Sequence, residues 1–292
     1  MSASESIAVT GATGQLGRLV VAELLRRAPS ARVIGVVRNP AAAKELADRG
    51  VELRKADYED SASVAAALAG ADKTLLISSS EVGRRVRHHR VVIDAAKAAG
   101  VKFLAYTSIL RADASPLALA REHRESEALI RASGLPFALL RNGWYTENYT
   151  VNIAAVIRHG AVLGAAGDGR ISSATRADYA AAAAAVLAGD AKGRAGKVYE
   201  LAGDEAYALA EYAAEIARQS GKPVVYKNLP ESGYKAALQA AGLPEVYAEI
   251  YAESDAKAAG GALYDAGREL SGLIGRPTTT LARSVAEALA AS

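Results

Sequence analysis

Close to its N-terminus the chain has a short apolar run that leads directly into a glycine-rich turn. Ile7–Thr10 is followed by Gly11-Ala12-Thr13-Gly14-Gln15-Leu16-Gly17 and then by an amphipathic segment, Leu19–Leu25. In a parallel α/β sheet, a strand that breaks into such a turn and opens a helix offers free amides and a positive dipole end to a pyrophosphate. This order of features predicts a dinucleotide site.

Each glycine of the turn has its own mechanical role. Gly11 allows the sharp turn after the strand, Gly14 removes the Cβ that would block a phosphate, and Gly17 lets the helix pack closely on the strand. The other predicted cofactor contacts of the turn are Thr13, Gln15 and Leu16. The alternative is a glycine-rich turn that binds nothing, but a regular alternation of strand and helix signals follows it.

Strand-like and helix-like segments alternate along the first half of the chain. Runs rich in Val, Ile and Leu occur at Ile7–Thr10, Arg32–Val37, Val51–Arg54, Thr74–Ser78, Phe103–Thr107 and Phe137–Leu140. Helix-period segments between them include Ala41–Arg49, Ser61–Leu68 and Arg87–Ala99. The alternation predicts an α/β fold with a doubly wound parallel sheet (Rossmann class), which binds its ligands beyond the carboxyl ends of the strands.

The pattern changes after about Tyr149. Ala-rich helical segments follow, with a Gly-rich loop at Gly164–Gly169 and short strand candidates at Lys197–Leu201 and Val224–Tyr226. We therefore expect a nucleotide-binding domain over residues 1–149 and a smaller C-terminal α/β region over residues 150–292 that supplies a substrate wall. Capping residues indicate two helix starts in this region, at Thr175–Asp178 and Thr278–Leu281.

Composition limits the classes of function. Of the 292 residues, 51% are hydrophobic and 23% charged, as in ordinary globular proteins, and a net charge of +3 without a lysine–arginine block argues against nucleic acid as a partner. The chain has no cysteine, which excludes disulfides, thiolate metal sites and cysteine nucleophiles. A polar Met1–Ser6 and the lack of a long apolar run predict a cytoplasmic protein that does not act at a membrane.

The end of the second predicted strand, Val36-Val37-Arg38-Asn39-Pro40, bears on the choice of cofactor. NAD-specific versions of this fold carry an acidic residue there, which binds the ribose hydroxyls and repels an added phosphate. Arg38 instead offers a guanidinium suited to a 2′-phosphate, which favours NADP(H) and leaves the use of NAD(H) open. The alternative is that Arg38 is a solvated loop residue.

Two further segments follow predicted strands at the same edge. Asp57 could accept a hydrogen bond from the adenine amino group, or it could cap the helix that begins near Ser61. Ser78, Ser79 and Ser80 close the fourth strand with small side chains against which a ribose or a nicotinamide can lie. Serine runs are also common in loops without a ligand.

In their order, these segments resemble the atypical short-chain dehydrogenases related to NmrA, and within that family the type-2 NAD(P)H:quinone oxidoreductases. The matching segments are GATGQLG (Gly11–Gly17), VVRNP (Val36–Pro40), LLISSSEVG (Leu75–Gly83), AAKAAGVKFLAYTS (Ala95–Ser108), LLRNGWYTENY (Leu139–Tyr149) and GAAGDGRISSATRADYA (Gly164–Ala180). The likeness covers nearly the whole chain. It implies a reductase that uses a nicotinamide cofactor.

The catalytic pair of a standard short-chain dehydrogenase is missing. Such enzymes use a serine with a Tyr-x-x-x-Lys pair, in which the tyrosine protonates an alkoxide. Ser108 follows the fifth strand as the family serine does, but Leu119 and His123 stand at the tyrosine and lysine positions. A quinone needs no such acid, because hydride addition gives a phenolate-like anion with a pKa of about 10 that solvent can protonate. The sequence thus indicates hydride transfer to a quinone or a similar planar acceptor, without flavin or metal.

Several residues are candidates for the acceptor site. His123 could hydrogen-bond the nicotinamide ribose or the acceptor oxygen, or it could make only a local bond on a helix face. Asn142, beyond the sixth strand, can donate to a carbonyl oxygen. Trp144, Tyr145 and Asn148 are candidates for a flat substrate wall, although the single tryptophan could equally be core.

A basic segment, Gly83–Arg90, contains the adjacent pair His88 and His89. Neighbouring residues point in different directions on a helix, so the two rings cannot readily share a metal ion. We expect a solvated cationic helix face here, with binding of a partner as the alternative, and assign no metal site.

Three functions share the predicted fold, so the fold cannot choose among them. The leading hypothesis is an NADPH-dependent quinone reductase. The alternatives are a triarylmethane-dye reductase and a redox-sensing regulator that binds the dinucleotide without turnover. A homodimer is a further expectation.

Overall fold

The computed structural model describes residues 5–292, which form two compact units. Unit 1 consists of the residues up to Ala112 together with Glu122–Asn142 and Arg176–Glu200. Unit 2 consists of Asp113–Arg121, Gly143–Thr175 and Leu201–Ser292. The chain passes between the units several times, and the division after residue 149 suggested by the sequence stays a prediction.

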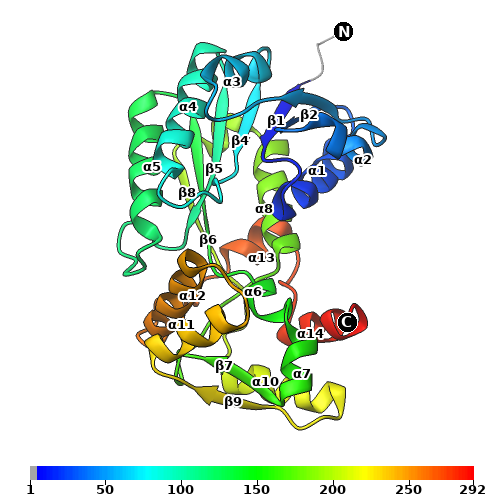
Figure 1. Cartoon of the computed structure of the whole chain (residues 1–292). Helices are drawn as coiled ribbons and strands as arrows, with labels where there is room; N and C mark the ends of the chain where they lie inside the picture. The colour runs from blue at the N-terminus through cyan, green and yellow to red at the C-terminus, as the bar shows by residue number, and fades with distance from the viewer. Residues whose placement is uncertain (1–4) are drawn as a thin grey trace. The chain divides into compact units, whose positions relative to one another are not determined.

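Unit 1 is built on a seven-stranded sheet with the order β3-β2-β1-β4-β5-β6-β8 (Figure 1). Its strands are β1 (Ser6–Thr10), β2 (Arg32–Val37), β3 (Glu52–Lys55), β4 (Lys73–Leu76), β5 (Phe103–Ile109), β6 (Phe137–Asn142) and β8 (Lys197–Leu201). The first six strands all pair in parallel. From β1 the strands are added first on one side, as β2 and β3, and then on the other, as β4, β5 and β6. The predicted doubly wound parallel sheet is confirmed.

The seventh strand is the segment Lys197–Leu201, which the sequence pattern places in the C-terminal region. In the structure it extends the main sheet beside β6, and Gly196 N donates to Phe137 O at 2.7 Å where the pair begins. Its side chains are mostly half-exposed, as is typical of an edge strand. Such a pattern predicts a strand but does not tell which sheet the strand joins.

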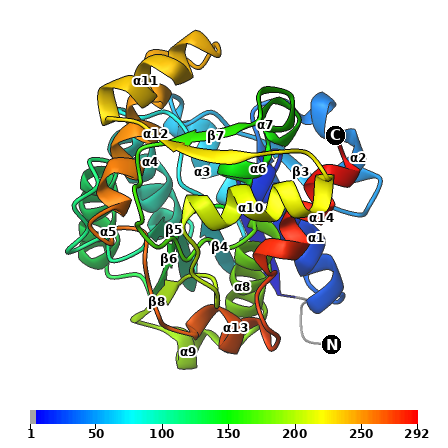
Figure 2. The ribbon, with the colours of Figure 1, turned by 90° about the horizontal axis from the view of Figure 1, so that it is seen from below.

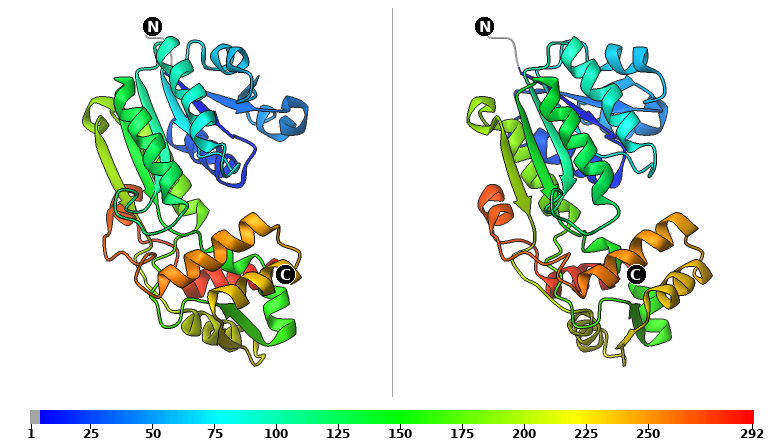
Figure 3. Two further views of the ribbon diagram at one scale, coloured as in Figure 1. Left: turned by 60° about the vertical axis from the view of Figure 1, so that its left-hand side comes forward. Right: turned by 90° about the vertical axis from the view of Figure 1, so that its left-hand side faces the viewer.

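Helices cover both faces of this sheet. On one face lie α3 (Ser61–Leu68), α4 (Arg85–Ala98) and α5 (Ala120–Ser133), with α4 and α5 side by side (Figure 1 and Figure 3). On the other, α1 (Gln15–Arg27) packs against the Ala-rich α8 (Arg176–Ala188). Shorter helices are η1 (Pro40–Ala43), α2 (Lys44–Ala47) and α9 (Ala191–Arg194). Because both faces are covered, the central strands β1, β4, β5 and β6 are almost fully buried, whereas the edge strands β3 and β8 are not.

Unit 2 contains a small parallel sheet of β7 (Ala161–Gly164) and β9 (Val225–Asn228). Its helices are α6 (Glu147–Thr150), α7 (Ile153–His159), α10 (Leu209–Ser220), α11 (Glu231–Ala240), α12 (Glu245–Ala258), α13 (Glu269–Ile274) and α14 (Leu281–Ala290). Figure 2 shows α10 alongside β7 and β9, and α11 packs on α12. Thr280 Oγ1 accepts from Arg283 N at the start of α14, which confirms the predicted helix start at Thr278–Leu281.

Within residues 5–292, every helix is too short or too polar to cross a membrane.

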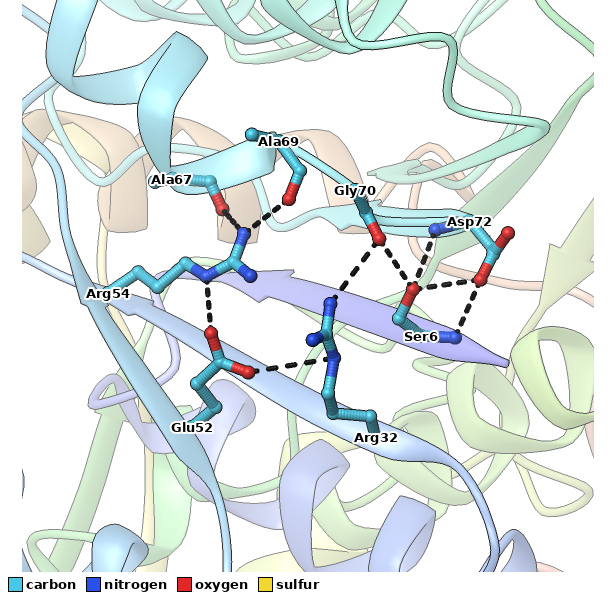
Figure 4. Close-up of polar contacts among 8 residues, drawn as sticks. All are labelled: Ser6, Arg32, Glu52, Arg54, Ala67, Ala69, Gly70 and Asp72. Atoms are coloured by element: carbon cyan, nitrogen blue, oxygen red, sulfur yellow. Dashed lines mark hydrogen bonds and ion pairs between the residues drawn. The ribbon is translucent and has the colours of Figure 1, made fainter. Parts of the chain in front are cut away.

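The amino ends of β1 and β4 are joined by a polar cluster (Figure 4). Ser6 Oγ lies 2.7 Å from Gly70 O and 2.8 Å from Asp72 Oδ2, and Ser6 N donates to the same carboxylate oxygen at 2.9 Å. Asp72 Oδ1 accepts from Lys102 Nζ at 2.8 Å. The Lys102 bond and then the Ser6 bonds lower the pKa of Asp72 from 3.8 to about 2. The carboxylate therefore stabilises this end of the sheet.

Replacing Asp72 with Ala should lower the free energy of unfolding at neutral pH by about 1 kcal/mol, because the buried Ser6 N–H loses its acceptor. Since the folded-state pKa lies below the ordinary 3.8, the charge contributes fully above pH 3.8 and its contribution is lost as the pH falls toward 2. Chemical denaturation of both proteins across this range measures the effect. Equal stability at neutral pH would contradict the prediction.

Candidate functional site

The glycine-rich turn joins β1 to α1 with the close packing that the sequence predicts. Gly11 has a φ of +61°, in the left-handed region. A Cβ on Gly17 would lie 2.2 Å from Gly11 O and 2.9 Å from Ala12 Cα, so no larger residue fits there. A Cβ on Gly14 would lie 3.2 Å from Gly11 O, and Gly14 N donates to that oxygen at 2.9 Å. The turn therefore has no room for a side chain at Gly17 and little room for one at Gly14.

The first turn of α1 presents backbone amides to the carboxyl edge of the sheet. The N-cap residue is Gly14, which has no side chain to cap the helix, and Gln15, Leu16 and Gly17 follow it. Amides in the first turn of a helix have no acceptor within the helix. Gly11, Gly14 and Gln15 are exposed, and Thr13 is half-buried, with its carbonyl accepting from the next turn of the helix. A diphosphate fits this arrangement, both sterically and electrostatically.

Arg38 follows β2 and has a largely exposed side chain. Its Nη1 lies 3.8 Å from Glu81 Oε1, too far for a hydrogen bond. The guanidinium can therefore exchange this exposed carboxylate for another anion at little cost.

Asp57 lies at the end of β3, but it is not the cap of α3. Its Oδ1 accepts from Glu59 N at 3.0 Å, within its own turn. The N-cap of α3 is Asp60, which accepts from Ala62 N and Ser63 N. The capping role that the sequence allows for Asp57 thus belongs to Asp60, because a cap must directly precede the first helical residue.

The segment after β4 crosses the carboxyl edge of the sheet. Thr10 Oγ1, at the end of β1, accepts from Ile77 N at 3.1 Å. Thr107 Oγ1, in β5, accepts from Ser78 N at 2.9 Å. These two threonine hydroxyls thus accept from backbone amides of a segment that is not paired in the sheet.

His88 and His89 are both buried, so the predicted solvated helix face is wrong for the two histidines. Ser79 N donates to His89 Nε2 at 3.0 Å, and Ser79 Oγ lies 3.2 Å from His88 Nδ1. The second nitrogens lie 3.0 Å from Glu59 Oε1 for His88 and 2.7 Å from Ser126 Oγ for His89. Since every ring nitrogen has a partner, both rings can be buried.

The solvated part of this basic segment is Arg84, Arg87 and Arg90, whereas Arg85 is half-buried. Arg84 and Arg87 are exposed and pair with Glu59 and Glu81. Across residues 5–292, no group of three or more His, Asp or Glu side chains is arranged to hold a metal ion.

His123 lies in the first turn of α5 and is also buried. Its Nδ1 is 2.8 Å from Tyr106 Oη. Burial, followed by the charge of Arg85, holds the pKa of His123 well below its usual value, and burial raises the pKa of Tyr106. The phenol therefore keeps its proton and donates to Nδ1, which leaves the proton of the neutral imidazole on Nε2.

Ser108 belongs to a buried ionic cluster. Its Oγ donates to Glu127 Oε1 at 2.6 Å. Glu127 also accepts two bonds from Arg141, at 2.9 and 2.8 Å, and Arg141 Nη1 donates to Glu200 Oε1 at 2.8 Å. The Ser108 hydroxyl thus helps to satisfy a buried carboxylate.

Asn142, the last residue of β6, is 3% exposed. Its Oδ1 and Nδ2 are both buried and have no hydrogen-bond partner among residues 5–292. A buried amide without partners costs free energy, because it has lost its bonds to water. The amide is thus suited to bind a carbonyl or an amide of a ligand.

In unit 2, Trp144 and Asn148 both contact Tyr251 of α12. The Trp144 and Tyr251 rings meet edge-to-face, with centroids 5.8 Å apart. Tyr251 Oη donates to Asn148 Oδ1 at 3.3 Å. Tyr145 is half-buried and forms a parallel bridge with Ala174. No local signal could have indicated Tyr251, which lies more than a hundred residues from its partners.

Comparison with known proteins agrees with this geometry. Residues 3–265 match the model of the NmrA-like family. This chain belongs to the NmrA-like family. Quinone oxidoreductase 2 of Escherichia coli (strain K12) is 56% identical over 279 residues, which are 96% of this chain and 97% of the relative.

Two solved structures superpose closely on this one. The E. coli NADPH-dependent quinone oxidoreductase complexed with NADPH gives a TM-score of 0.93 at 55% identity, covering 97% of this chain and 99% of its own. The Citrobacter sp. triphenylmethane reductase complexed with NADP(H) gives 0.92 at 38% identity, covering 97% and 99%.

The sequence predicts Leu119 and His123 at the positions of the catalytic pair of standard short-chain dehydrogenases. Leu119 precedes α5, and His123 is in the first turn of that helix. In standard enzymes the lysine of the pair lowers the pKa of the catalytic tyrosine. Neither Leu119 nor His123 can take that role, because leucine is apolar and the buried His123 is neutral.

Replacing Asn142 with Leu, which has a similar shape, should raise the free energy of unfolding of the ligand-free protein by about 1 kcal/mol, because it removes an unpartnered buried amide. The matched control is Asn148→Leu, which removes an acceptor of Tyr251 and should lower stability. Denaturant titration measures both. A loss of stability in Asn142→Leu would show that the amide has a partner in the free protein.

Proposed function

We propose that this protein is an NADPH-dependent oxidoreductase that transfers hydride directly to a quinone or a similar conjugated, planar acceptor, without flavin. The observation that carries the proposal is the 56% identity with E. coli quinone oxidoreductase 2, which extends over 96% of this chain and 97% of the relative. The geometry of the glycine-rich turn supports it independently, since a Cβ at Gly17 would leave no room for the helix.

The residues of unit 1 that would hold NADPH follow from their places at the carboxyl edge of the sheet. The amides of the turn from Gly11 to Gly17 suit the pyrophosphate, and Arg38 suits the 2′-phosphate. Asp57 lies beyond β3 for the adenine, and Ser78–Ser80 offer a surface for the ribose and nicotinamide. NADPH supplies the hydride when it is bound.

The acceptor is assigned to polar groups that carry no charge. Asn142 would donate to an acceptor carbonyl, and His123 would offer the Nε2 proton of a neutral imidazole. Trp144, Tyr145 and Asn148, which belong to unit 2, stay predicted substrate contacts. Ser108, whose hydroxyl donates to Glu127, would hold the cluster beneath this edge in place.

Protonation of the product needs no acid from this chain. A reduced quinone leaves as a phenolate-like anion with a pKa of about 10, which water protonates at neutral pH. A simple ketone would give a much stronger base, for which the neutral imidazole of His123 is a far weaker acid than the missing tyrosine, and Leu119 has no proton to give. The residues present therefore favour conjugated acceptors over ketones.

A triarylmethane dye is a second candidate acceptor. The observation that favours it is the 38% identity to the Citrobacter triphenylmethane reductase over 97% of this chain. NmrA with bound NAD is only 18% identical, so that likeness shows a shared fold and leaves the regulator hypothesis to the activity assay. A cytoplasmic location and a homodimer stay predictions, the latter testable by analytical ultracentrifugation.

The test of the proposal is steady-state oxidation of NADPH by the flavin-free protein, with benzoquinone, a triarylmethane dye and a simple ketone as acceptors. We expect turnover with benzoquinone and none with the ketone. Turnover of the dye alone would favour the second candidate. Binding of NADPH without turnover of any acceptor would favour the regulator.

Arg38→Ala should raise the KM for NADPH about tenfold or more, because a charge-assisted bond to the 2′-phosphate is lost. The KM for NADH should stay within about twofold, since NADH lacks that phosphate. Initial-rate kinetics with both cofactors measure the difference, with Arg158→Ala in α7 as an exposed control. Equal effects on the two cofactors would remove Arg38 from the phosphate site.

His123→Ala should lower kcat roughly tenfold and leave the shape of the pH profile unchanged between about pH 6 and 9, because the wild-type ring is already neutral there. The control is His159→Ala, a change of an exposed histidine. Unchanged kcat and cofactor affinity would exclude His123 from the site. A loss confined to one limb of the pH profile would mean that it acts as an acid or base.

A further inference from the structure

One residue of the segment after β4 is held by three side chains from a single helix. Arg85, His88 and His89 lie at positions i, i+3 and i+4 of α4 and therefore share a face. Arg85 Nε donates to Ser79 O at 2.6 Å, His89 Nε2 accepts from Ser79 N, and His88 Nδ1 meets Ser79 Oγ. We call these three side chains the Ser79 clasp.

The direction of each hydrogen bond in the clasp follows from the donors and acceptors available. His89 Nε2 accepts from an N–H, so Nδ1 carries the proton and donates to Ser126 Oγ, whose own proton goes to Glu122 O at 2.7 Å. Burial, and then the charge of Arg85, lowers the pKa of His89 to about 3. The ring therefore stays a neutral acceptor for Ser79 N at physiological pH.

The His88 side of the clasp is equally complete. Ser79 Oγ accepts from Glu81 N at 3.2 Å, and because the Glu59 carboxylate can only accept from Nε2, Nδ1 of the neutral His88 ring is left to accept the Ser79 hydroxyl proton. His88 Nε2 then donates to Glu59 Oε1. The backbone N, backbone O and Oγ of Ser79 all have partners, which leaves the hydroxyl no proton to give to a ligand.

We propose that His89, supported by His88, is a positioning residue for the nicotinamide cofactor: it fixes the backbone of Ser78–Ser80 before the cofactor binds. The inference rests on the proposed function. The Ser78–Ser80 segment has no helix or strand of its own, and outside the clasp it is also held by the Ser78 N bond to Thr107. A loop ordered in advance lowers the conformational cost of binding.

The cost of the clasp supports a role beyond packing. Burying two imidazoles requires a partner for each of four ring nitrogens, whereas apolar side chains would fill the same helix face without that demand. What the two polar rings do, and apolar side chains could not, is fix Ser79 by hydrogen bonds. Ser79 lies at the edge where the proposed function places the ribose and nicotinamide.

Two substitutions of His89 separate its two bonds. In His89→Gln the side-chain amide reaches the position of Nε2 and can still accept from Ser79 N, but the bond to Ser126 is lost. In His89→Asn the amide reaches the position of Nδ1 and can still donate to Ser126, but Ser79 N loses its acceptor. The exposed His159→Gln is the control for a histidine change elsewhere.

We expect His89→Asn to weaken NADPH binding about tenfold by calorimetry, because Ser79 N is left unsatisfied and the loop is freed. His89→Gln and His159→Gln should bind within about twofold of wild type. In steady-state assays the KM for NADPH should rise in His89→Asn while kcat changes less. Wild-type affinity in His89→Asn, or an equal loss in Asn and Gln variants, would overturn the proposal.

Amide hydrogen exchange of the loop peptide without cofactor gives a readout that does not depend on the proposed function. Exchange should be faster around Ser79 in His89→Asn than in His89→Gln, and equal rates would overturn the proposal. Failure of the wild-type protein to bind NADPH would refute the proposed function, and with it the role of the clasp in cofactor binding. The exchange data would still show whether His89 fixes the loop.

Discussion

The rest of unit 1 depends on the contact between the first turn of α1 and the turn that leaves β1. With a Cβ on Gly17 only 2.2 Å from Gly11 O, the helix can start where it does only because that Cβ is absent. This close approach aims the first amides of α1 along the carboxyl edge of the sheet. It also fixes the opposite side of the helix, which packs on α8, where alanines allow two helices to lie close together. A single steric constraint thus sets both the anion site and the packing of one face.

Covering both faces of the sheet decides where polar chemistry can occur. Buried polar groups at the carboxyl edge are mostly satisfied within the protein: Thr10 and Thr107 accept from the segment after β4, and Ser79 is held by the clasp. Asn142 differs, because its buried amide has no partner within residues 5–292. The edge therefore combines a rigid frame with a buried amide that is still able to form hydrogen bonds. Preorganisation of this kind favours binding, since little remains to be ordered when a ligand arrives.

The sequence predicts those parts of the fold that local patterns encode. The predicted bounds of β2 and α3 match the structure, because the ends of a buried apolar run and of a capped helix can be recognised in the local sequence. Local patterns do not show which sheet a strand joins: the sequence of β8 predicts a strand, but not that it pairs in the main sheet. Candidate site residues such as Arg38 and Ser78 can be named from the sequence, because each stands at the end of a predicted strand. The burial of His88 and His89 could not be foreseen, because their partners include residues about thirty positions away along the chain.

The charge state of the buried groups bears on the reaction that unit 1 can support. His123 and His89 are neutral, Tyr106 keeps its proton, and the carboxylate of Glu127 is paired with Arg141. An acceptor that becomes a localised alkoxide would need a strong proton donor or a positive charge from such groups, whereas a neutral imidazole offers only an uncharged hydrogen-bond donor. An acceptor that spreads its charge over a conjugated ring needs only hydrogen-bond donors of fixed position. Neutral donors held in place by burial are what this edge provides, and for that reason the loss of the tyrosine–lysine pair narrows the acceptors without removing hydride transfer.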